Sequence, residues 1–152
     1  MYQIFSGVAL FLGDQIIKHN IEQKMELHEE KSILHNHVIL TRYHNDGVAL
    51  NILEKHKKIV AALSVGLSAF LSCLSIYLFT GRQKKVQPFM CQLAFIFLLS
   101  GAWSNTFDRV KKGFVVDYFY FNTKCKRLRN IVFNLADMFI FLGAFLLSIF
   151  RR

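Results

Sequence analysis

Charged residues are missing from two long parts of this sequence, and their absence indicates the class of protein. Residues 59–80 and 86–107 contain no Asp, Glu, Lys or Arg. At a rise of about 1.5 Å per residue, either run forms a helix of roughly 33 Å, which crosses a hydrocarbon core of about 30 Å. A third apolar run, 131–150, is interrupted only by Asp137, and a shorter one occupies residues 1–17. The sequence therefore predicts an α-helical integral membrane protein with four transmembrane helices.

Several motifs of known chemistry are absent as well. The three cysteines form no Cys-x-x-Cys pair and are too few for a disulfide framework. There is no Gly-x-Ser-x-Gly, no His-Glu-x-x-His and no Gly-rich phosphate loop. All six histidines lie in one polar segment, and the pair His35 and His37 has no third ligand nearby. We therefore expect no bound metal, no cofactor and no intramembrane Ser–His pair.

Two polar segments, 19–58 and 108–130, separate the predicted helices. The first contains two β-prone runs around Asn45-Asp46-Gly47, which is a hairpin turn signal. The second contains the aromatic and β-branched run GFVVDYFYFN, another predicted strand. With four spans both segments lie on one side of the membrane, so we expect one domain, 1–152, with a small β platform on the membrane surface.

Basic residues outnumber acidic ones by 19 to 10. This excess suits contact with anionic lipid headgroups. The positive-inside rule does not decide the orientation, because cations are dense in the short segment 81–86 but more numerous in the two longer polar segments. Charge alone leaves the topology open.

Carboxylates in or beside the apolar runs are the candidates for chemistry. An Asp near the middle of a membrane helix costs roughly 2.5–3.5 kcal/mol on insertion scales, so such residues are usually functional or paired. Four acids fit this description: Asp14, Asp108, Asp117 and Asp137. Asn-x-x-Asp occurs twice, as Asn105 with Asp108 and as Asn134 with Asp137, and this spacing puts the amide and the carboxyl on one helix face.

Two interpretations of these acids stay open. Asp14 with Lys18, and Asp108 with Arg109, form a polar network that ties the helix ends to the surface segments, or they serve a reaction. Asp117 and Asp137 have no adjacent cation and are the better candidates for catalysis. Two close carboxyls share a proton because both do not readily ionise. The ionised one activates water and the protonated one polarises a carbonyl, which suits peptide hydrolysis.

Four stretches of the chain share their order and motifs with one enzyme family. They are DQIIK (14–18), NDGVAL (45–50), SGAWSNTFDRVKKGFVVDYF (100–119) and FNLAD (133–137). The chain resembles the lipoprotein signal peptidases (signal peptidase II), which are bacterial membrane aspartyl proteases that act on lipid-modified prolipoproteins. The spacing from Asn-x-x-Asp-Arg to Val-Val-Asp and then Phe-Asn-x-Ala-Asp makes the resemblance specific.

The resemblance implies a multi-pass protein of the bacterial cytoplasmic membrane, with both termini in the cytoplasm and an extracytoplasmic β cradle. It implies Asp117 and Asp137 as the catalytic dyad, near the extracytoplasmic surface. Substrate-binding or supporting residues would be Asn45, Gly47, Asn105, Asp108, Arg109, Asn134, Asp14 and Lys18. The substrate would be a diacylglyceryl-modified prolipoprotein cut just before its lipidated Cys, and the inhibitor would be globomycin. We expect a monomer without a nucleic-acid partner.

Some positions depart from the family pattern: Ser104, Leu50 and Met138, together with the basic loop 122–130. None removes a candidate catalytic group. Two other functions stay open, an inactive lipid- or lipoprotein-binding paralogue and a proton-coupled small membrane transporter. The transporter would need acids in several spans, and two of the predicted spans contain none.

Overall fold

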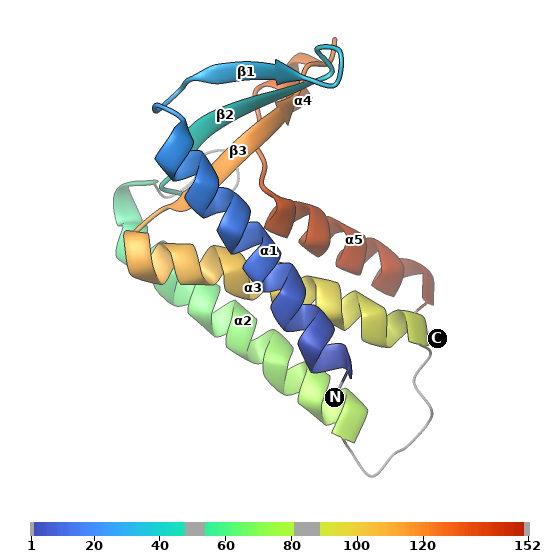
Figure 1. Ribbon diagram of the computed structural model, residues 1–152. Coiled ribbons are helices and arrows are strands. Elements are labelled where there is room, and N and C mark those ends of the chain that lie inside the picture. Colours follow the sequence, from blue (N-terminus) through green and yellow to red (C-terminus); the bar gives the residue numbers. More distant parts are fainter. Residues whose placement is uncertain (1, 48–53, 81–88, 151–152) are drawn as a thin grey trace.

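The computed structural model describes residues 2–47, 54–80 and 89–150 (Figure 1). In chain order its elements are α1 (Tyr2–Lys24), β1 (Glu30–Ile33), β2 (Val38–Asn45), the 3-10 helix η2 (Glu54–His56), α2 (Lys57–Thr80), α3 (Phe89–Lys112), β3 (Val115–Phe121), the single-turn α4 (Lys126–Arg129) and α5 (Leu135–Phe150). The sequence predictions of a mostly helical chain and of a strand in GFVVDYFYFN are confirmed.

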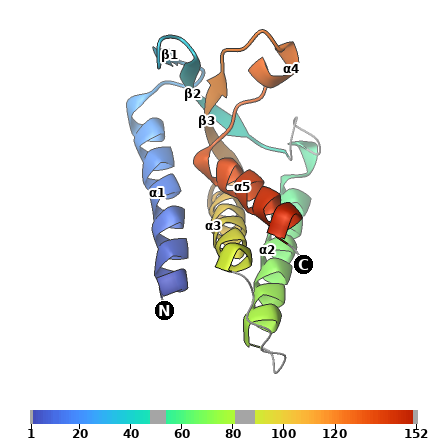
Figure 2. The same ribbon diagram turned by 90° about the vertical axis from the view of Figure 1, so that its right-hand side faces the viewer.

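Helix α3 is the centre of the helical part, and α1, α2 and α5 all pack against it. Figure 2 shows α1 and α2 on opposite sides of α3, with α5 crossing it. Two glycines allow the closest of these contacts. A Cβ at Gly143 would lie 2.7 Å from the carbonyl oxygen of Ala94, and one at Gly101 would lie 2.8 Å from Ile140. Small residues at these positions let the backbones of α3 and α5 approach.

Within the described residues, α2 and α3 are long and apolar enough to cross a membrane. Helix α5 is apolar but shorter. The outer faces of these helices expose large apolar side chains, among them Leu63, Phe70 and Phe145. Such a surface suits contact with lipid rather than water.

The three strands form one antiparallel sheet in the order β1–β2–β3. Ile39 pairs with Tyr120 and Asn45 pairs with Val115, with an irregularity between Leu40 and Tyr43. The structure contains a hairpin that the sequence did not predict, in which the turn 34–37 joins β1 to β2. The second half of the predicted hairpin, 48–53, lies outside the described residues.

Three helix boundaries differ from the prediction. Helix α3 ends at Lys112 rather than at 107, so that Asp108 and Arg109 lie on the helix and not in the polar segment that follows it. Helix α1 continues to Lys24 rather than ending near residue 17, because the Arg42 guanidinium donates to the carbonyl oxygens of Glu22 and Met25 at the end of the helix. Helix α5 begins at Leu135 rather than at 131, because Phe133 pairs with Phe119 of β3 in an extended conformation. Asp137 therefore lies in the first turn of α5.

Candidate active site

A cavity of about 460 Å³ lies between α2, α3, α5 and the sheet. Its polar lining includes Asp117 and Asp137. Apolar side chains line the rest of it, among them Leu67, Ile140 and Phe141. The fold thus brings together two acids that are separated in the sequence, in a cavity with both a polar and an apolar wall.

Asp117 is contributed by β3 and is 2% exposed. Its two carboxyl oxygens accept one amide hydrogen bond each, from Asn45 Nδ2 at 3.0 Å and from Asn134 Nδ2 at 2.6 Å. Burial raises the pKa of the Asp117 carboxyl to about 7, and the nearby carboxylate of Asp137 adds to the increase, while the two amides oppose it. This carboxyl therefore exchanges a proton near neutral pH.

Asn134 and Asp137 form a reciprocal cap at the start of α5. The Asn134 side-chain oxygen accepts from the Asp137 backbone N–H at 2.9 Å. The Asp137 carboxyl in turn accepts from the Asn134 backbone N–H at 3.1 Å. This arrangement is a capping box, in which two otherwise unpaired helix N–H groups are satisfied. The Asn-x-x-Asp pattern at this position therefore orients the Asp137 carboxyl by starting the helix.

Asn105 on α3 connects Asp137 to a buried lysine. Its Nδ2 donates to Asp137 Oδ1 at 2.8 Å, and its Oδ1 accepts from Lys18 Nζ at 2.9 Å and from Asn134 Nδ2 at 3.1 Å. A lysine ammonium can only donate, so Lys18 holds the Asn105 oxygen toward itself and the amide nitrogen toward Asp137.

Lys18 is fully buried between two fully buried carboxylates. Its ammonium lies 2.8 Å from Asp14 and 3.1 Å from Asp108. The expected pair of Asp14 with Lys18 is therefore present. Asp108 was expected to pair with Arg109. Instead, its second oxygen pairs with Lys112 at 3.1 Å. Buried charges of this kind are stable only when paired and hydrogen-bonded.

Arg109 donates to the backbone carbonyl oxygen of Gly47 at 3.1 Å. Arg109 therefore acts as a donor to a peptide carbonyl. Arg109 also lines the cavity, and its Nε is buried with no hydrogen-bond partner within the described parts of the chain. An unpaired buried donor beside a cavity is available to an incoming acceptor.

Sequence reasoning missed two residues that hold Asp14. Ser104, noted only as a departure, donates to Asp14 Oδ2 at 2.6 Å. Tyr118 donates to Asp14 Oδ1 at 3.1 Å and accepts the backbone N–H of Leu135 at 2.9 Å, which joins α1, β3 and the start of α5. Burial and the neighbouring Asp14 raise the pKa of Tyr118, so it stays a hydrogen-bond donor. The only available signal was the position of Tyr118 beside Asp117. Two other positions were noted as departures from the family pattern. Met138 follows Asp137 on α5, and Leu50 lies outside the described residues.

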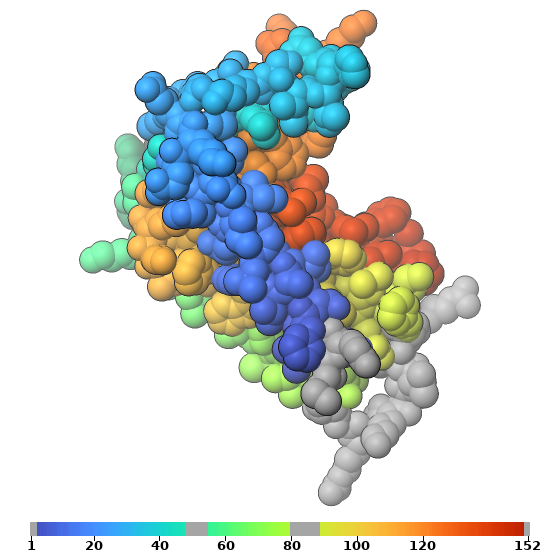
Figure 3. Space-filling model, in the orientation of Figure 1, coloured from blue at the N-terminus to red at the C-terminus, as the bar shows by residue number. Residues whose placement is uncertain are grey.

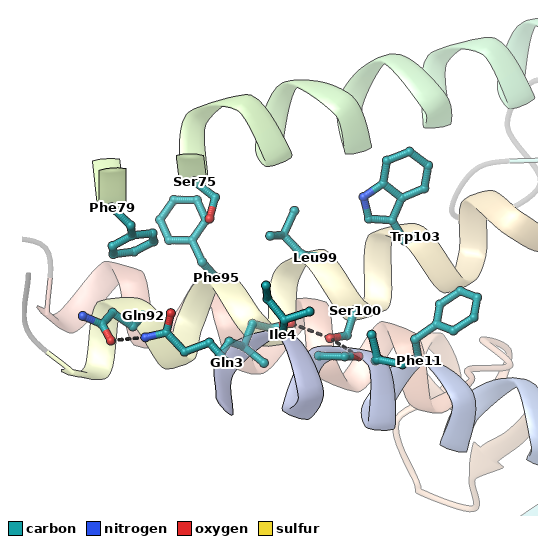
Figure 4. A pocket seen from close by; sticks show the side chains of 13 residues that line it. Gln3, Ile4, Phe11, Ser75, Phe79, Gln92, Phe95, Leu99, Ser100 and Trp103 are labelled. Atoms are coloured by element: carbon teal, nitrogen blue, oxygen red, sulfur yellow. Dashed lines mark hydrogen bonds between the residues drawn. The ribbon is translucent and has the colours of Figure 1, made fainter. Parts of the chain in front are cut away.

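A second cavity, of about 400 Å³, lies between α1, α2 and α3 (Figure 4). Phe95, Leu99 and Trp103 line it, and Gln3 hydrogen-bonds to Gln92 at one end. No charged or histidine side chain is present among the described residues that line it. Of these two cavities, the one between α2, α3, α5 and the sheet is the one lined by carboxyl groups.

The model of one protein family, signal peptidase (SPase) II, matches residues 7–151. The chain belongs to the signal peptidase II family. It is 31% identical to the lipoprotein signal peptidase of Allorhizobium ampelinum, covering 90% of this chain and 79% of that one. It is 33% identical to the lipoprotein signal peptidase of Brucella ovis, covering 93% of this chain and 83% of that one. Family membership indicates a peptidase that removes signal peptides from prolipoproteins.

Solved structures of bacterial membrane enzymes share the fold. One superposes with a TM-score of 0.82 at 26% identity, covering 97% of this chain and 85% of that one. Another superposes with a TM-score of 0.80 at 24% identity, covering 97% and 90%. The likeness includes both the helices and the sheet, since both superpositions cover nearly the whole of this chain.

Proposed function

We propose that the chain is a membrane aspartyl endopeptidase with Asp117 and Asp137 as its catalytic pair. The observation that carries this proposal is the position of Asn134. Its side chain donates to the Asp117 carboxyl, and its backbone N–H donates to the Asp137 carboxyl. One residue thereby holds both acids toward the same cavity.

In the proposed reaction the pair holds one proton. The ionised carboxylate takes a proton from water as the water oxygen attacks the scissile carbonyl carbon. The protonated carboxyl donates its proton to the carbonyl oxygen, which gives a tetrahedral gem-diol intermediate. As this intermediate collapses, the carboxyl that took the water proton gives it to the leaving amine, and the other carboxylate takes a proton back from the gem-diol. The pKa of about 7 at Asp117 supports this sharing, because a proton is then held and released at neutral pH.

The surrounding polar residues keep the pair in place. Asn45 orients Asp117, and Asn105 orients Asp137. Lys18, which pairs with Asp14 and Asp108, holds Asn105 in place through a hydrogen bond to its side-chain oxygen. We propose that Arg109 steadies the Gly47 segment and offers its unpaired Nε to a substrate carbonyl oxygen.

The proposed substrate is a diacylglyceryl-modified prolipoprotein, cleaved just before the lipidated Cys. The apolar part of the cavity, with Leu67, Ile140 and Phe141, suits an acylated cysteine better than a polar side chain. The aspartates lie beside these apolar side chains, which supports a scissile bond close to the lipid.

We further propose that α1, α2, α3 and α5 all span the bacterial cytoplasmic membrane. Helix α1 has 23 residues, or roughly 35 Å, and its charges at Asp14 and Lys18 are buried against α3 rather than facing lipid. Both termini would lie in the cytoplasm, and the sheet and the aspartates at the extracytoplasmic surface. The charge counts alone do not decide this orientation.

The test is cleavage of a synthetic diacylglyceryl-cysteine peptide by the purified protein, with the products identified by mass spectrometry. We expect one new N-terminus, at the lipidated Cys. The same peptide without its lipid should be a poor substrate. Cleavage at another bond, or equal cleavage of both peptides, would contradict the proposed substrate.

A further inference from the structure

The end of the sheet farthest from the start of β3 carries an unusual surface, which we name the sheet tip. It consists of the turn 34–37 and the segment 121–129, which includes α4. Asn122 joins the two parts, because its backbone N–H donates to His37 O and its side chain donates to Asn36 O, both at 2.9 Å. The tip is therefore one surface rather than two separate loops.

Four cations are concentrated in six residues of the tip. Lys124, Lys126, Arg127 and Arg129 are all exposed, and within the described parts of the chain none of them forms a salt bridge. By contrast, Lys31 and Lys57 pair with acids at 2.8 Å. The sheet tip thus holds positive charge with no salt-bridge partner in the described structure.

Large apolar side chains lie among these cations. Leu34 is 66% exposed, Leu128 is 47% exposed and Phe121 is 39% exposed. Leu34 is also held at a φ of 50°, a left-handed conformation that disfavours a bulky residue. A surface that mixes exposed cations with exposed aromatic and aliphatic groups is typical of the membrane interface, where apolar groups enter the acyl boundary and cations meet headgroups.

The position of the tip relative to the helices indicates which surface it meets. The sheet projects sideways beyond the start of α5, so that its far end with α4 overhangs the flank of the helical part (Figure 1). Figure 3 shows the hollow between this overhang and α5. Helix α5 exposes Phe141 and Phe145, at 56% and 60%, and lipid would cover such apolar side chains. The sheet tip projects beside these lipid-facing helices, at the end of the helices where the sheet lies. A surface in this position would meet the surface of the bilayer.

We infer that the sheet tip is a docking surface for anionic phospholipid headgroups, with Lys126, Arg127 and Arg129 as its main contacts. Clustered cations next to a membrane helix attract anionic lipids, and the attraction decays within the Debye length. The segment that follows the tip, Asn130 and Ile131, lines the cavity of the aspartates. Anionic lipid would therefore be enriched at the mouth of that cavity. The inference depends on the membrane placement proposed above and not on the catalytic roles.

Cys125 lies within the tip and is exposed, so it can carry an environment-sensitive probe. In a C73A/C91A background it is the single thiol. We would label it with an NBD group and compare nanodiscs of phosphatidylcholine alone with nanodiscs that also contain phosphatidylglycerol. We expect blue-shifted emission and protection from a water-soluble quencher only with phosphatidylglycerol. Protection should be lost at about 1 M salt, where the Debye length is about 3 Å.

Matched variants separate charge from structure. K126Q/R127Q/R129Q should lose the response to phosphatidylglycerol, whereas the charge-conserving K126R/R127K/R129K should keep it. D117N should keep it too, which separates this inference from the protease activity. For unlabelled protein with all its cysteines, mass spectrometry should find at least a few-fold less co-purified phosphatidylglycerol with the Gln variant. Equal protection in neutral and anionic nanodiscs, or a Gln variant that behaves as wild type, would overturn the inference.

Discussion

Asn134 and Asp137 cap the same helix through two reciprocal hydrogen bonds, at 2.9 and 3.1 Å, while Asn134 also donates to Asp117. A carboxylate is favoured at a helix N-terminus, where the helix dipole and free N–H groups attract negative charge. The acid that seemed misplaced in an apolar helix therefore lies at the one end of that helix that favours it. The same contacts start α5 and aim the candidate catalytic carboxyl.

Substitutions at Asn134 should separate its role as the cap of α5 from the hydrogen bond that its side-chain amide donates to Asp117. Ser is as good an N-cap as Asn, so N134S should keep the helix cap, and its loss of thermal stability should come only from the missing amide hydrogen bonds to Asp117 and Asn105. It lacks the amide that donates to Asp117, so its kcat/KM should fall by about ten- to a hundredfold, because a hydrogen bond to a charged group contributes about 1.5–3 kcal/mol. N134A should lose the same activity and also about 1 kcal/mol of stability. Full activity in N134S would show that the amide does not orient Asp117.

The raised pKa of Asp117 should make stability depend on pH. Its value of about 7 in the folded protein lies above the ordinary 3.8, so the unfolded chain releases this proton first as the pH rises. The contribution of Asp117 to stability is thus fully present below about pH 4 and is lost as the pH rises to about 7. In detergent, the melting temperature of wild type should fall over this range, and D117N should show a flatter profile.

A companion variant tests the cause of that pKa. The charge of Asp137 is the second contribution after burial, so D137N should shift the midpoint of the pH profile downward without abolishing it. An unchanged midpoint in D137N would mean that the two carboxyls do not interact.

Lys18 should contribute strongly to the stability of the folded protein. K18M leaves Asp14 without its cation and Asp108 with Lys112 alone, and removing one partner of a buried pair costs about 3–5 kcal/mol. We expect a large loss of thermal stability, partly restored in D14N/K18M. K24M is the matched control, because Lys24 is exposed at the end of the same helix and its loss should change little. Wild-type stability in K18M would contradict the buried network.

Gly101 should control the distance between α3 and α5. In G101A the new methyl group would meet the carbonyl oxygen of Ala136 and the side chain of Ile140, so the two helices must separate. We expect a loss of about 1–3 kcal/mol, typical of overpacking, and a lower kcat because Asp137 follows Ala136 directly. G66A on α2 has open space around its new Cβ and should keep both properties. If G101A and G66A had the same stability and the same kcat, Gly101 would not control the distance between α3 and α5.

The pattern of apolar runs predicted α2 and α3 well, because a long uncharged stretch has few other interpretations. It placed the start of α5 four residues too early, since hydropathy does not distinguish the extended Ile131–Phe133 from helix. It could not predict the pairing of Phe133 with Phe119, nor the contact of Lys18 with Asn105, because both depend on how distant segments pack. The lack of an adjacent cation made Asp117 and Asp137 the candidate pair, and the family resemblance implied that they form the catalytic dyad. The predicted position of Asp117 on a strand is confirmed.

The most direct test of the central claim compares wild type with D117N and D137N, each purified and given the lipidated peptide at neutral pH. Our account predicts that each Asn variant is folded and loses at least about a hundredfold in kcat, since acid–base catalysis by a positioned side chain contributes about 10²–10⁴-fold. The double variant should be no slower than either single one, because the two acids act as one unit. Cleavage at the wild-type rate by D117N or by D137N would contradict the account.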